Sequence, residues 1–560
     1  MKQLLLSLFC LVCCSVYSQN YVIQGLVYNL NSEDMTASVV SCKIPGIDNW
    51  DIDSMALEVV VVPKSVNIGD ATYHVTSIGD NAFENCPGII YVELPSSLRE
   101  IGKYAFQGCV NLSSVNIPKS VEIIGEGCFM ACENMREVKL PANLMRIQTA
   151  TFAYCSALNN VVTPSGLLEI GRMAFQSCSN LRKITLNEGL GKIAYSAFAE
   201  CGFSSLTIPS SVTAIGGKAF CNCQSLASIA LPSSLVTLGD SVFHDCANLS
   251  RVRMTGCQAY GSDFDGRMFY RKNEGTYNTI LFYNRQADVC VIPDSFDIAP
   301  GVFRNNRKLT RVVLPGSLKT IGDFAFEGCT ALRDIAIPKG IEYIGKGAFQ
   351  GCNSLKAFNV FNGNKYFTSD NGKVLFHHKK GGVEMVCYTD SVATVIIPSC
   401  VTELGYALFS GHQEITNIHI PNTVKAIGAL AFHHCPNLRS ITLPVGIDVI
   451  HDQTFDSCMS LDQIVLPRSV TKLGDNVFNN CAKLSLLVLP EGLVDVGNYL
   501  FIGCDPAKLK IVSLSPVPAI SRSNTFKGVD TVELHVPVGS AESYRNHIGW
   551  GRFRNIVGDL

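Results

Sequence analysis

The sequence carries little charge and has no excess of either sign. Only 16% of its 560 residues are charged, and 45 Lys and Arg stand against 47 Asp and Glu. A nearly neutral chain lacks the positive field that steers proteins to nucleic acid or to acidic lipid. Its 47% hydrophobic content supplies enough apolar material for a core, which excludes a disordered chain. The composition therefore indicates a folded protein without a nucleic-acid partner.

The sequence also lacks the short motifs on which common enzyme mechanisms depend. It has no G-x-S-x-G nucleophile turn, no H-E-x-x-H zinc helix and no glycine-rich phosphate loop. Asp263-x-Asp265-Gly266 resembles the start of a calcium loop but lacks the later oxygen ligands, so we interpret it as a hairpin turn. The polar run His377 to Lys380 is expected to be a solvated loop. We predict no enzyme activity, no cofactor and no metal site.

No apolar stretch after the N-terminus approaches the roughly 18 residues that a membrane helix needs. At the N-terminus, Lys2 precedes an apolar run over residues 4–14, and Val16 and Ser18 then form a small-residue cleavage pattern before Gln19. This arrangement is typical of a secretory signal peptide, here residues 1–18. We expect the mature chain to be secreted or held at the cell surface, with no membrane span.

An internal repeat dominates the rest of the chain. One phenylalanine recurs sixteen times, mostly at steps of 23 residues, within the unit I-G-x-x-A-F-x-x-C-x-x-L-x-x-V-x-L-P. The sixteen positions are Phe83, Phe106, Phe129, Phe152, Phe175, Phe198, Phe220, Phe243, Phe303, Phe326, Phe349, Phe409, Phe432, Phe455, Phe478 and Phe501. A period in the twenties with this leucine pattern predicts a leucine-rich-repeat solenoid.

Each repeat contains one short strand. In the unit around Phe106, Val115 and Ile117 alternate with polar neighbours, which is the period of a strand with one buried face. Pro118 then ends the strand because it has no N–H to donate. We predict coils of about 23 residues with a parallel β-sheet on the concave face and short helical turns opposite. Gly102 is expected to ease the turn that leads to Phe106.

The repeat is interrupted twice, each time by a gap of 60 residues between successive phenylalanines. Each gap contains Asp-Gly or Asn-Gly between apolar runs, which predicts two β-hairpin islands in the solenoid. The expected organisation is a signal peptide (1–18), an N-terminal β cap (19–76) with a hairpin-like stretch at 57–63, repeats (77–256), an island (257–293), repeats (294–361), an island (362–398), repeats (399–511) and a C-terminal cap (512–560).

The 24 cysteines do not form a zinc-binding pattern. Fourteen of them stand three residues after a repeat phenylalanine, so each coil contributes one thiol to a line. Zinc needs ligands that converge at short spacings. We predict a ladder of buried, reduced thiols, whereas the spacing alone leaves disulfides between neighbouring coils undecided.

The outward strand positions are the candidate binding surface. Most are small and uncharged, but Lys183, Arg251, Arg253 and Arg311 are basic, and the three arginines flank the first island. They predict a basic spot for an acidic partner, although a solvated strand face would look the same. Phe264, Phe269 and Tyr270, or Tyr366 and Phe367, would favour glycan stacking if they were exposed together at the island tips.

The sixteen units, together with residues 73–83 and 536–544, resemble the BspA-like leucine-rich-repeat surface proteins that are common in Bacteroidetes. The resemblance covers nearly the whole mature chain and implies adhesion to host matrix proteins, host cells or other bacteria. It carries no fixed site residues. We therefore expect an exported protein that mediates protein–protein or cell-surface adhesion through its solenoid. The alternative is a carbohydrate-binding or structural surface scaffold, with a glycan among its partners.

Overall fold

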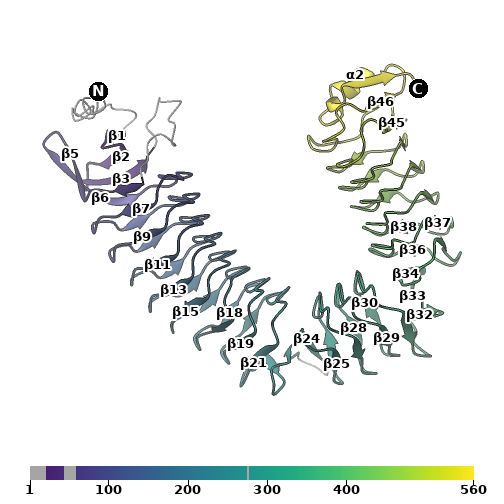
Figure 1. Ribbon diagram of the computed structural model, residues 1–560, viewed down its shortest axis with the longest axis horizontal. Helices are drawn as coiled ribbons and strands as arrows, with labels where there is room; N and C mark the ends of the chain where they lie inside the picture. The colour runs from purple at the N-terminus through teal and green to yellow at the C-terminus, as the bar shows by residue number, and fades with distance from the viewer. Residues whose placement is uncertain (1–19, 43–57, 274–276) are drawn as a thin grey trace. The chain divides into compact units, whose positions relative to one another are not determined.

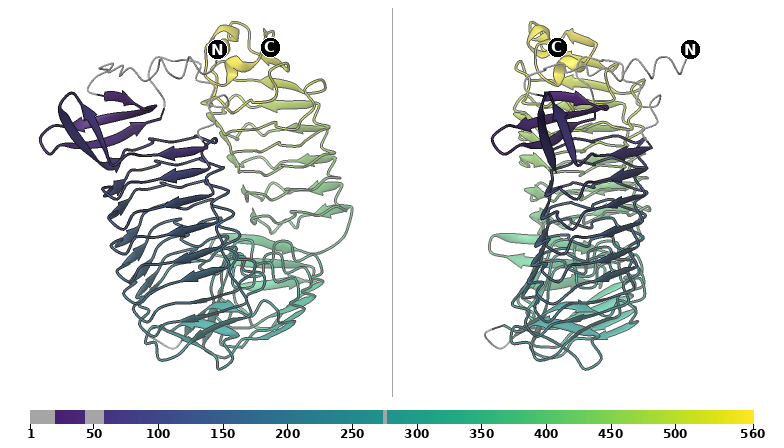
Figure 2. Two further views of the ribbon diagram at one scale, coloured as in Figure 1. Left: turned by 60° about the vertical axis from the view of Figure 1, so that its left-hand side comes forward. Right: turned by 90° about the vertical axis from the view of Figure 1, so that its left-hand side faces the viewer.

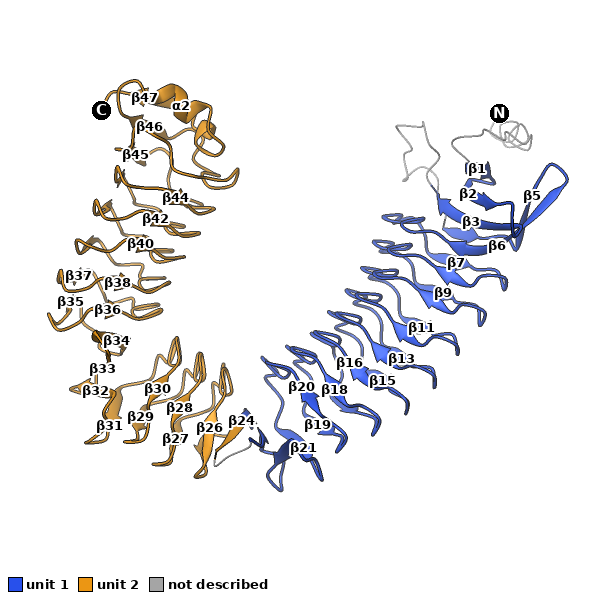
Figure 3. Cartoon of the chain, turned by 180° about the vertical axis from the view of Figure 1, so that it is seen from behind, with its two compact units in different colours: residues 1–275, 280–286 blue, residues 276–279, 287–560 orange. Residues whose placement is uncertain are grey.

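The chain folds as a β-solenoid of stacked parallel coils, which confirms the predicted leucine-rich-repeat fold (Figure 1). The structure is a computed structural model and describes residues 20–42, 58–273 and 277–560. The predicted signal peptide (1–18) lies outside these residues. The chain divides into two compact units, residues 1–275 with 280–286 and residues 276–279 with 287–560, coloured separately in Figure 3. Each unit is described by itself below.

Each coil contributes one strand of three or four residues to what we call the first ladder. Neighbouring strands pair in parallel with residues 23 positions apart opposite each other, such as Val138 and Val161. The central side chain is buried and its two neighbours are exposed, as predicted from the alternation. In the first unit the ladder comprises β4 (Val59–Val61), β7 (Tyr91–Glu93), β9 (Ser114–Asn116), β11 (Glu137–Lys139), β13 (Asn160–Val162), β15 (Lys183–Thr185), β17 (Ser205–Thr207), β19 (Ser228–Leu231) and β21 (Arg251–Met254). In the second unit it comprises β25 (Val289–Val291), β27 (Arg311–Val313), β29 (Asp334–Ile337), β31 (Ala357–Val360), β35 (Thr394–Ile396), β37 (Asn417–His419), β39 (Ser440–Thr442), β41 (Gln463–Val465), β43 (Leu486–Leu489), β45 (Lys510–Ser513), β46 (Glu533–Val536) and β47 (Asn555–Gly558).

A second ladder of mostly two-residue strands runs through the I-G end of each repeat. It comprises β6 (Ala71–Ile78), β8 (Glu100–Ile101), β10 (Ile123–Ile124), β12 (Arg146–Ile147), β14 (Glu169–Ile170), β16 (Lys192–Ile193), β18 (Ala214–Ile215) and β20 (Thr237–Leu238) in the first unit. It continues as β26 (Phe296–Ile298), β28 (Thr320–Ile321), β30 (Tyr343–Ile344), β36 (Glu403–Leu404), β38 (Ala426–Ile427), β40 (Val449–Ile450), β42 (Lys472–Leu473) and β44 (Asp495–Val496) in the second. The views in Figure 2 show these coils stacked within each unit.

The glycine of the I-G pair is required by the contact between coils and not by a turn. A Cβ on Gly125 would lie 2.5 Å from the carbonyl carbon of Gly102 in the preceding coil. Gly102 itself has no positive φ, so the expectation that it eases a turn is wrong. Glycine is retained here because the backbones of successive coils approach too closely for a side chain.

The segments opposite the first ladder are single hydrogen-bonded turns and do not extend into helices. Cys109 N–H donates to the Phe106 carbonyl within the turn, and Phe106 N–H donates to Cys128 of the next coil at 2.8 Å. Positive φ angles at Tyr104 and Gly108 reverse the chain before a helix can form. Among the described residues, the α-helix is α2 (Ala541–Arg545) and the 3-10 helix is η1 (Trp550–Arg552).

The repeat phenylalanines form stacked columns inside the solenoid. All sixteen are buried, and neighbouring rings such as Phe83 and Phe106 stack with centroids 5.0 Å apart and planes 3° apart. Phe526 continues the last column beyond Phe501 and was missed because it follows after 25 residues without a repeat cysteine. The aromatic columns explain why one residue type persists through so many coils.

The fourteen repeat cysteines are all buried, as predicted. In thirteen coils the sulfur donates to the carbonyl of the phenylalanine one coil earlier, as Cys155 does to Phe129 at 3.1 Å. Burial raises the pKa of the Cys155 thiol to about 12. The thiolate, which is the reactive form, is therefore suppressed at Cys155.

Both predicted islands contain antiparallel strands. The first consists of β22 (Tyr260–Ser262), β23 (Met268–Arg271) and β24 (Asn278–Tyr283), with β22 antiparallel to β23. The second consists of β32 (Phe367–Asp370), β33 (Val374–Lys379) and β34 (Gly382–Tyr388), a continuous antiparallel meander. Each island places large side chains in the core, among them Phe269 and Phe367. The islands are therefore part of the hydrophobic core as well as of the surface.

The two ends of the chain close the core differently. At the N-terminus, β1 (Asn20–Ile23), β2 (Leu26–Asn31) and β3 (Thr36–Ser41) form antiparallel pairs, and β5 (Ser65–Ile68) pairs antiparallel with β6. The hairpin expected at 57–63 is wrong, because β4 pairs in parallel with β7 as the first rung of the first ladder. At the C-terminus, Trp550 is fully buried against Phe526 and closes the last column.

Candidate functional site

The four basic residues predicted for binding all lie at exposed positions of the first ladder. Lys183 lies in β15, Arg251 and Arg253 lie in β21, and Arg311 lies in β27. Lys183 is three coils from β21, or roughly 14 Å at about 4.8 Å per strand. Arg311 belongs to the second unit. Within the first unit, the structure places Arg251 and Arg253 together, on the same face of one strand.

The turn of the first island lies directly against Val252 and Arg253 of β21. Val252 N–H, between the two arginines in β21, donates to the Gly266 carbonyl at 2.7 Å. A Cβ on Gly266 would come within 2.8 Å of Arg253 Cγ, and the φ of Gly266 is 70°. Both observations explain the glycine at this position. The turn is thus fixed beside Arg253, where it extends the surface of the last strand.

The same turn presents Phe264 fully to solvent. Its relative exposure is 101%, the highest among the exposed large hydrophobic residues. A fully exposed aromatic ring is unusual for a folded protein, since burial of such a ring favours folding by about 1.5–3 kcal/mol. We call Arg251, Arg253 and Phe264 the Arg–Phe patch. It combines two cations with an aromatic side chain, the residue types enriched in the energetic centres of protein interfaces.

The carboxylates of the island turn already have partners. Asp265 lies 3.6 Å from the Arg267 guanidinium, and the Asp263 carboxylate accepts the Met268 N–H at 3.0 Å. No ion pair of Arg251 or Arg253 is found among the described residues. The carboxylates next to the patch are therefore already paired within the turn. The two guanidinium groups of the patch can pair with acidic side chains of a partner protein.

The aromatic residues suggested for glycan stacking are not exposed together. Phe269 and Phe367 are buried, and Tyr366 is 39% exposed. Phe264 lies in the loop between β22 and β23 and Tyr366 just before β32, whereas Phe269 and Phe367 lie within strands whose side chains enter the core. The island tips therefore do not form an aromatic platform for sugars.

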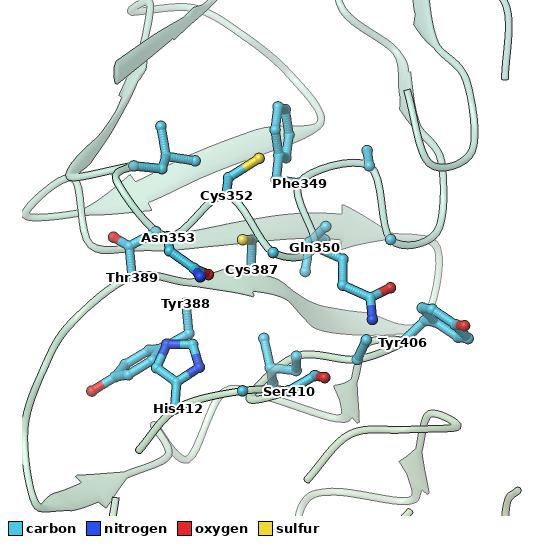
Figure 4. Close-up of a pocket in the computed structure, with 18 of the residues that line it drawn as sticks. Phe349, Gln350, Cys352, Asn353, Cys387, Tyr388, Thr389, Tyr406, Ser410 and His412 are labelled. Atoms are coloured by element: carbon cyan, nitrogen blue, oxygen red, sulfur yellow. The ribbon is translucent and has the colours of Figure 1, made fainter. Parts of the chain in front are cut away.

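A cavity of about 300 Å³ lies beside the second island, within the second unit (Figure 4). It occurs where the phenylalanine column is interrupted between Phe349 and Phe409. Tyr388 of β34 occupies this gap and meets Phe409 edge-on, with centroids 5.2 Å apart. His412, at the position where the repeat has a cysteine, lies beside Tyr388 at a ring separation of 5.6 Å.

The cavity combines aromatic and polar groups. His412 Nδ1–H donates to the Phe409 carbonyl at 3.1 Å, which orients the imidazole. Burial lowers the pKa of His412 below its ordinary value of 6.5, so the ring is neutral at neutral pH. The amide of Asn353 and the hydroxyl of Thr389 line the same space. These groups can hydrogen-bond a neutral polar ligand.

The polar cluster of the second island is held by carboxylates. Lys379 lies 2.8 Å from Glu384 and 2.9 Å from Glu403, and the His377 ring stacks on Phe367. Within residues 20–42, 58–273 and 277–560, no group of three His, Cys, Asp or Glu side chains could hold a metal ion. The same residues contain no helix with the length and hydropathy required to cross a membrane.

The stacked coils and their two ladders define a leucine-rich-repeat solenoid. The profile of the BspA type leucine rich repeat region, in six copies, matches residues 63–181, 146–270, 277–371 and 384–508. These ranges include well over half of the chain, so the protein belongs to the BspA-type leucine-rich-repeat family. A comparison with curated proteins finds no match.

Several solved structures are similar to this chain. A leucine rich cell surface protein of Faecalibacterium prausnitzii is 24% identical over 76% of this chain and 95% of its own, with a TM-score of 0.50. A leucine-rich repeat protein of Bacteroides ovatus is 24% identical over 89% and 94%, with a TM-score of 0.29. The pneumococcal vaccine antigen PcpA is 15% identical over 98% and 100%, with a TM-score of 0.37. At these identities the similarity concerns the fold alone.

Proposed function

We propose that the protein is exported and binds protein partners at the cell surface, with the Arg–Phe patch at the centre of its binding surface. The observation that carries the proposal is Phe264, fully exposed on a turn that is fixed against Arg253, in the strand that also carries Arg251. Such a ring gains burial only when a partner covers it. The partner chemistry that fits is an acidic protein surface with an apolar pocket for the ring.

Two further observations support this proposal. The family includes surface proteins, and the N-terminal residues 1–18 have the pattern of a signal peptide. The first ladder also offers a long row of fixed backbone positions, which suits recognition of an extended protein surface. Adhesion to a host or bacterial surface component would follow if the partner is displayed there.

The proposal is tested with the mature chain on a panel of immobilised extracellular-matrix proteins, for example fibronectin, fibrinogen, laminin and collagen. We expect the wild-type chain to bind at least one of them, and the triple variant Arg251→Glu, Arg253→Glu, Phe264→Ala to lose that binding. Circular dichroism of the variant should match the wild type, because all three side chains are exposed. Equal binding by a folded triple variant would refute the patch as the binding centre.

A second candidate function is glycan binding at the cavity beside the second island. The observation that favours it is the combination of Tyr388, His412, Asn353 and Thr389 around about 300 Å³, since sugar sites pair aromatic rings with hydrogen-bonding groups. A glycan array probed with the mature chain tests it. Binding that disappears with Asn353→Ala but persists with Phe264→Ala would assign glycan recognition to the cavity. An array without signal would refute this candidate.

A further inference from the structure

Cys86 is the first member of the cysteine ladder, and its surroundings differ from those of the later members. In the next coil, the Cys109 sulfur donates to the Phe83 carbonyl at 3.1 Å. In this sequence no repeat phenylalanine precedes Phe83. The place that a phenylalanine carbonyl occupies beside the later ladder sulfurs is therefore taken, beside Cys86, by another part of the chain. That part is Cys42, at the end of the N-terminal strands, whose sulfur lies 3.0 Å from the Cys86 sulfur.

This separation is shorter than ordinary contact between two sulfur atoms. Even the smaller carbon atoms pack at about 3.5–4.0 Å, whereas a disulfide bond joins its sulfurs at about 2.0 Å. The two thiols therefore lie about 1 Å from bonding distance. Neither sulfur has to move through the hydrophobic core for the bond to form.

The backbone on both sides is fixed by hydrogen bonds. Cys42 N–H donates to the Ala82 carbonyl at 2.9 Å, four residues before Cys86. The preceding strand β3 pairs in parallel with β6, with Val39 opposite Ile78. Cys86 is buried and Cys42 is partly exposed, so an oxidant can reach one of the two sulfurs. The contact thus joins the N-terminal cap to the first repeat coil at a defined point.

We propose that Cys42 and Cys86 form a disulfide in the exported protein, which latches the N-terminal cap to the first coil. The two thiols lose two protons and two electrons, which pass to a disulfide of an extracytoplasmic thiol–disulfide oxidant and leave it as a dithiol. The other thirteen ladder thiols remain reduced, because each sulfur is engaged with a phenylalanine carbonyl inside the core. The proposal rests on the export proposed above, since disulfides persist in oxidising compartments.

The experiment uses the mature full-length chain in a buffer of oxidised and reduced glutathione. After the remaining thiols are blocked with iodoacetamide, the protein is digested without reductant and its peptides are analysed by mass spectrometry. We expect a cross-linked peptide that joins Cys42 to Cys86, two hydrogens lighter than the two thiol peptides together. Cys42→Ser should abolish it, whereas the matched control Cys400→Ser, at an exposed thiol, should leave it unchanged.

The latch has a second readout in hydrogen exchange. We expect exchange of β2 and β3 to be at least about tenfold slower in the oxidised chain than in the reduced chain or in Cys42→Ser. Free Cys42 and Cys86 in the glutathione buffer, or a cross-link from Cys86 to Cys109, would overturn the proposal. The same peptide analysis is applied to protein collected from the medium of cells that produce it. It distinguishes the proposal of export from the proposal of the disulfide. Absence of the chain from that fraction would contradict export, while the result in glutathione still decides the disulfide.

Discussion

The two islands interrupt the repeat in the same way but present different surfaces. In each, a glycine carbonyl of the first hairpin accepts the N–H of the residue at the second position of the preceding ladder strand, Gly266 from Val252 and Gly372 from Phe358. Both islands also follow a phenylalanine that closes its column, Phe243 and Phe349. The two islands are therefore attached to the solenoid in the same way. They can be compared by the side chains that each turn exposes.

The turns differ in length and backbone conformation. The second island turns through Asn371 and Gly372, both with positive φ, which is the tight arrangement that matches the twist of a hairpin. In the first island, β22 ends at Ser262 and β23 begins at Met268, and only Gly266 in the loop between them has a positive φ. Five residues (263–267) therefore separate the strands of the first hairpin, against three (371–373) in the second, and Phe264 lies in the longer loop.

The ladder strands beside the turns differ as well. The strand before the first island has Arg251 and Arg253 at its exposed positions, whereas the strand before the second has Ala357 and Asn359. The first island thus gains a charged aromatic surface, and the second gains a cavity where its column is interrupted. The two insertions thus share their attachment to the preceding strand and differ in loop length, in exposed strand residues and in the packing beside them.

The largest effect should come from truncating the aromatic residue that closes a column. Phe243→Ala and Phe349→Ala should each reduce local stability by about 3–5 kcal/mol, because both remove a buried ring. Hydrogen exchange should locate the loss in the coils next to each island, since coils contact mainly their neighbours. If one of the two substitutions costs less than about 1 kcal/mol, the islands do not close the core equivalently.

The second-largest effect should show that the two islands contribute differently to binding. Arg251→Glu with Arg253→Glu should weaken binding to the matrix protein recognised by the wild type by at least about tenfold, or about 1.4 kcal/mol. The salt dependence of that binding should fall with it. Asn359→Glu is the matched control, at the corresponding position of the strand before the second island. Surface plasmon resonance at two salt concentrations measures the affinity and its salt dependence for each variant. An equal loss of affinity in Asn359→Glu would show that the two islands do not differ in binding.

A smaller effect concerns the cavity and pH. Because burial lowers the pKa of His412 below 6.5, the folded state disfavours the charged ring. As pH falls below 6.5, the unfolded chain binds a proton that the folded chain resists, so stability present above 6.5 is lost down to the folded pKa. The protection factors of amides near β34, which are exchange rates corrected for the intrinsic rate at each pH, should therefore decrease from pH 7.5 to 5.5.

His412→Cys restores the repeat residue and is the control for this pH effect. It should reduce the acid response around the cavity but leave that of the first island unchanged. Burial also lowers the pKa of the nearby His433, so a residual response in the same direction is expected. A response of equal size in both islands of the wild type would argue against His412 as its source.

The smallest effect on the protein should come from native alkylation. Cys400 is exposed, and iodoacetamide should label it within minutes without altering stability. Cys257 and Cys290, in the predicted first island, are buried and should react at least about a hundredfold more slowly. Peptide mass spectrometry after timed quenching compares the sites. Rapid labelling of Cys257 would indicate that the first island opens more readily than its packing implies.

Much of the fold could be predicted from the sequence because the same pattern of buried and exposed positions recurs in sixteen units. The Phe106 unit alone is compatible with several structures, but sixteen such units require one stacked core. The close approach of Gly125 to Gly102 and the parallel pairing of Val59–Val61 could not be predicted, because both depend on how coils are spaced. Phe526 was missed because its spacing departs from the period.

The candidate site was predicted only in part, for a related reason. Alternation identified Arg251 and Arg253 as exposed, but it could not place Arg311 or Lys183 relative to them. It also could not tell that Phe264 is exposed while Phe269 is buried, because the loop between the strands breaks the period of two. The useful signal was the island itself, an interruption with a turn longer than two residues.

The most direct test of the account compares single aromatic substitutions at the two island tips. Phe264→Ala and Tyr366→Ala each remove one exposed ring, at the first and second island respectively. Affinity for the matrix protein bound by the wild type is measured for both by surface plasmon resonance. The account predicts a loss of about thirtyfold, near 2 kcal/mol, for Phe264→Ala and a change within about twofold for Tyr366→Ala. Unchanged affinity in a folded Phe264→Ala variant, or a larger loss in Tyr366→Ala, would contradict it.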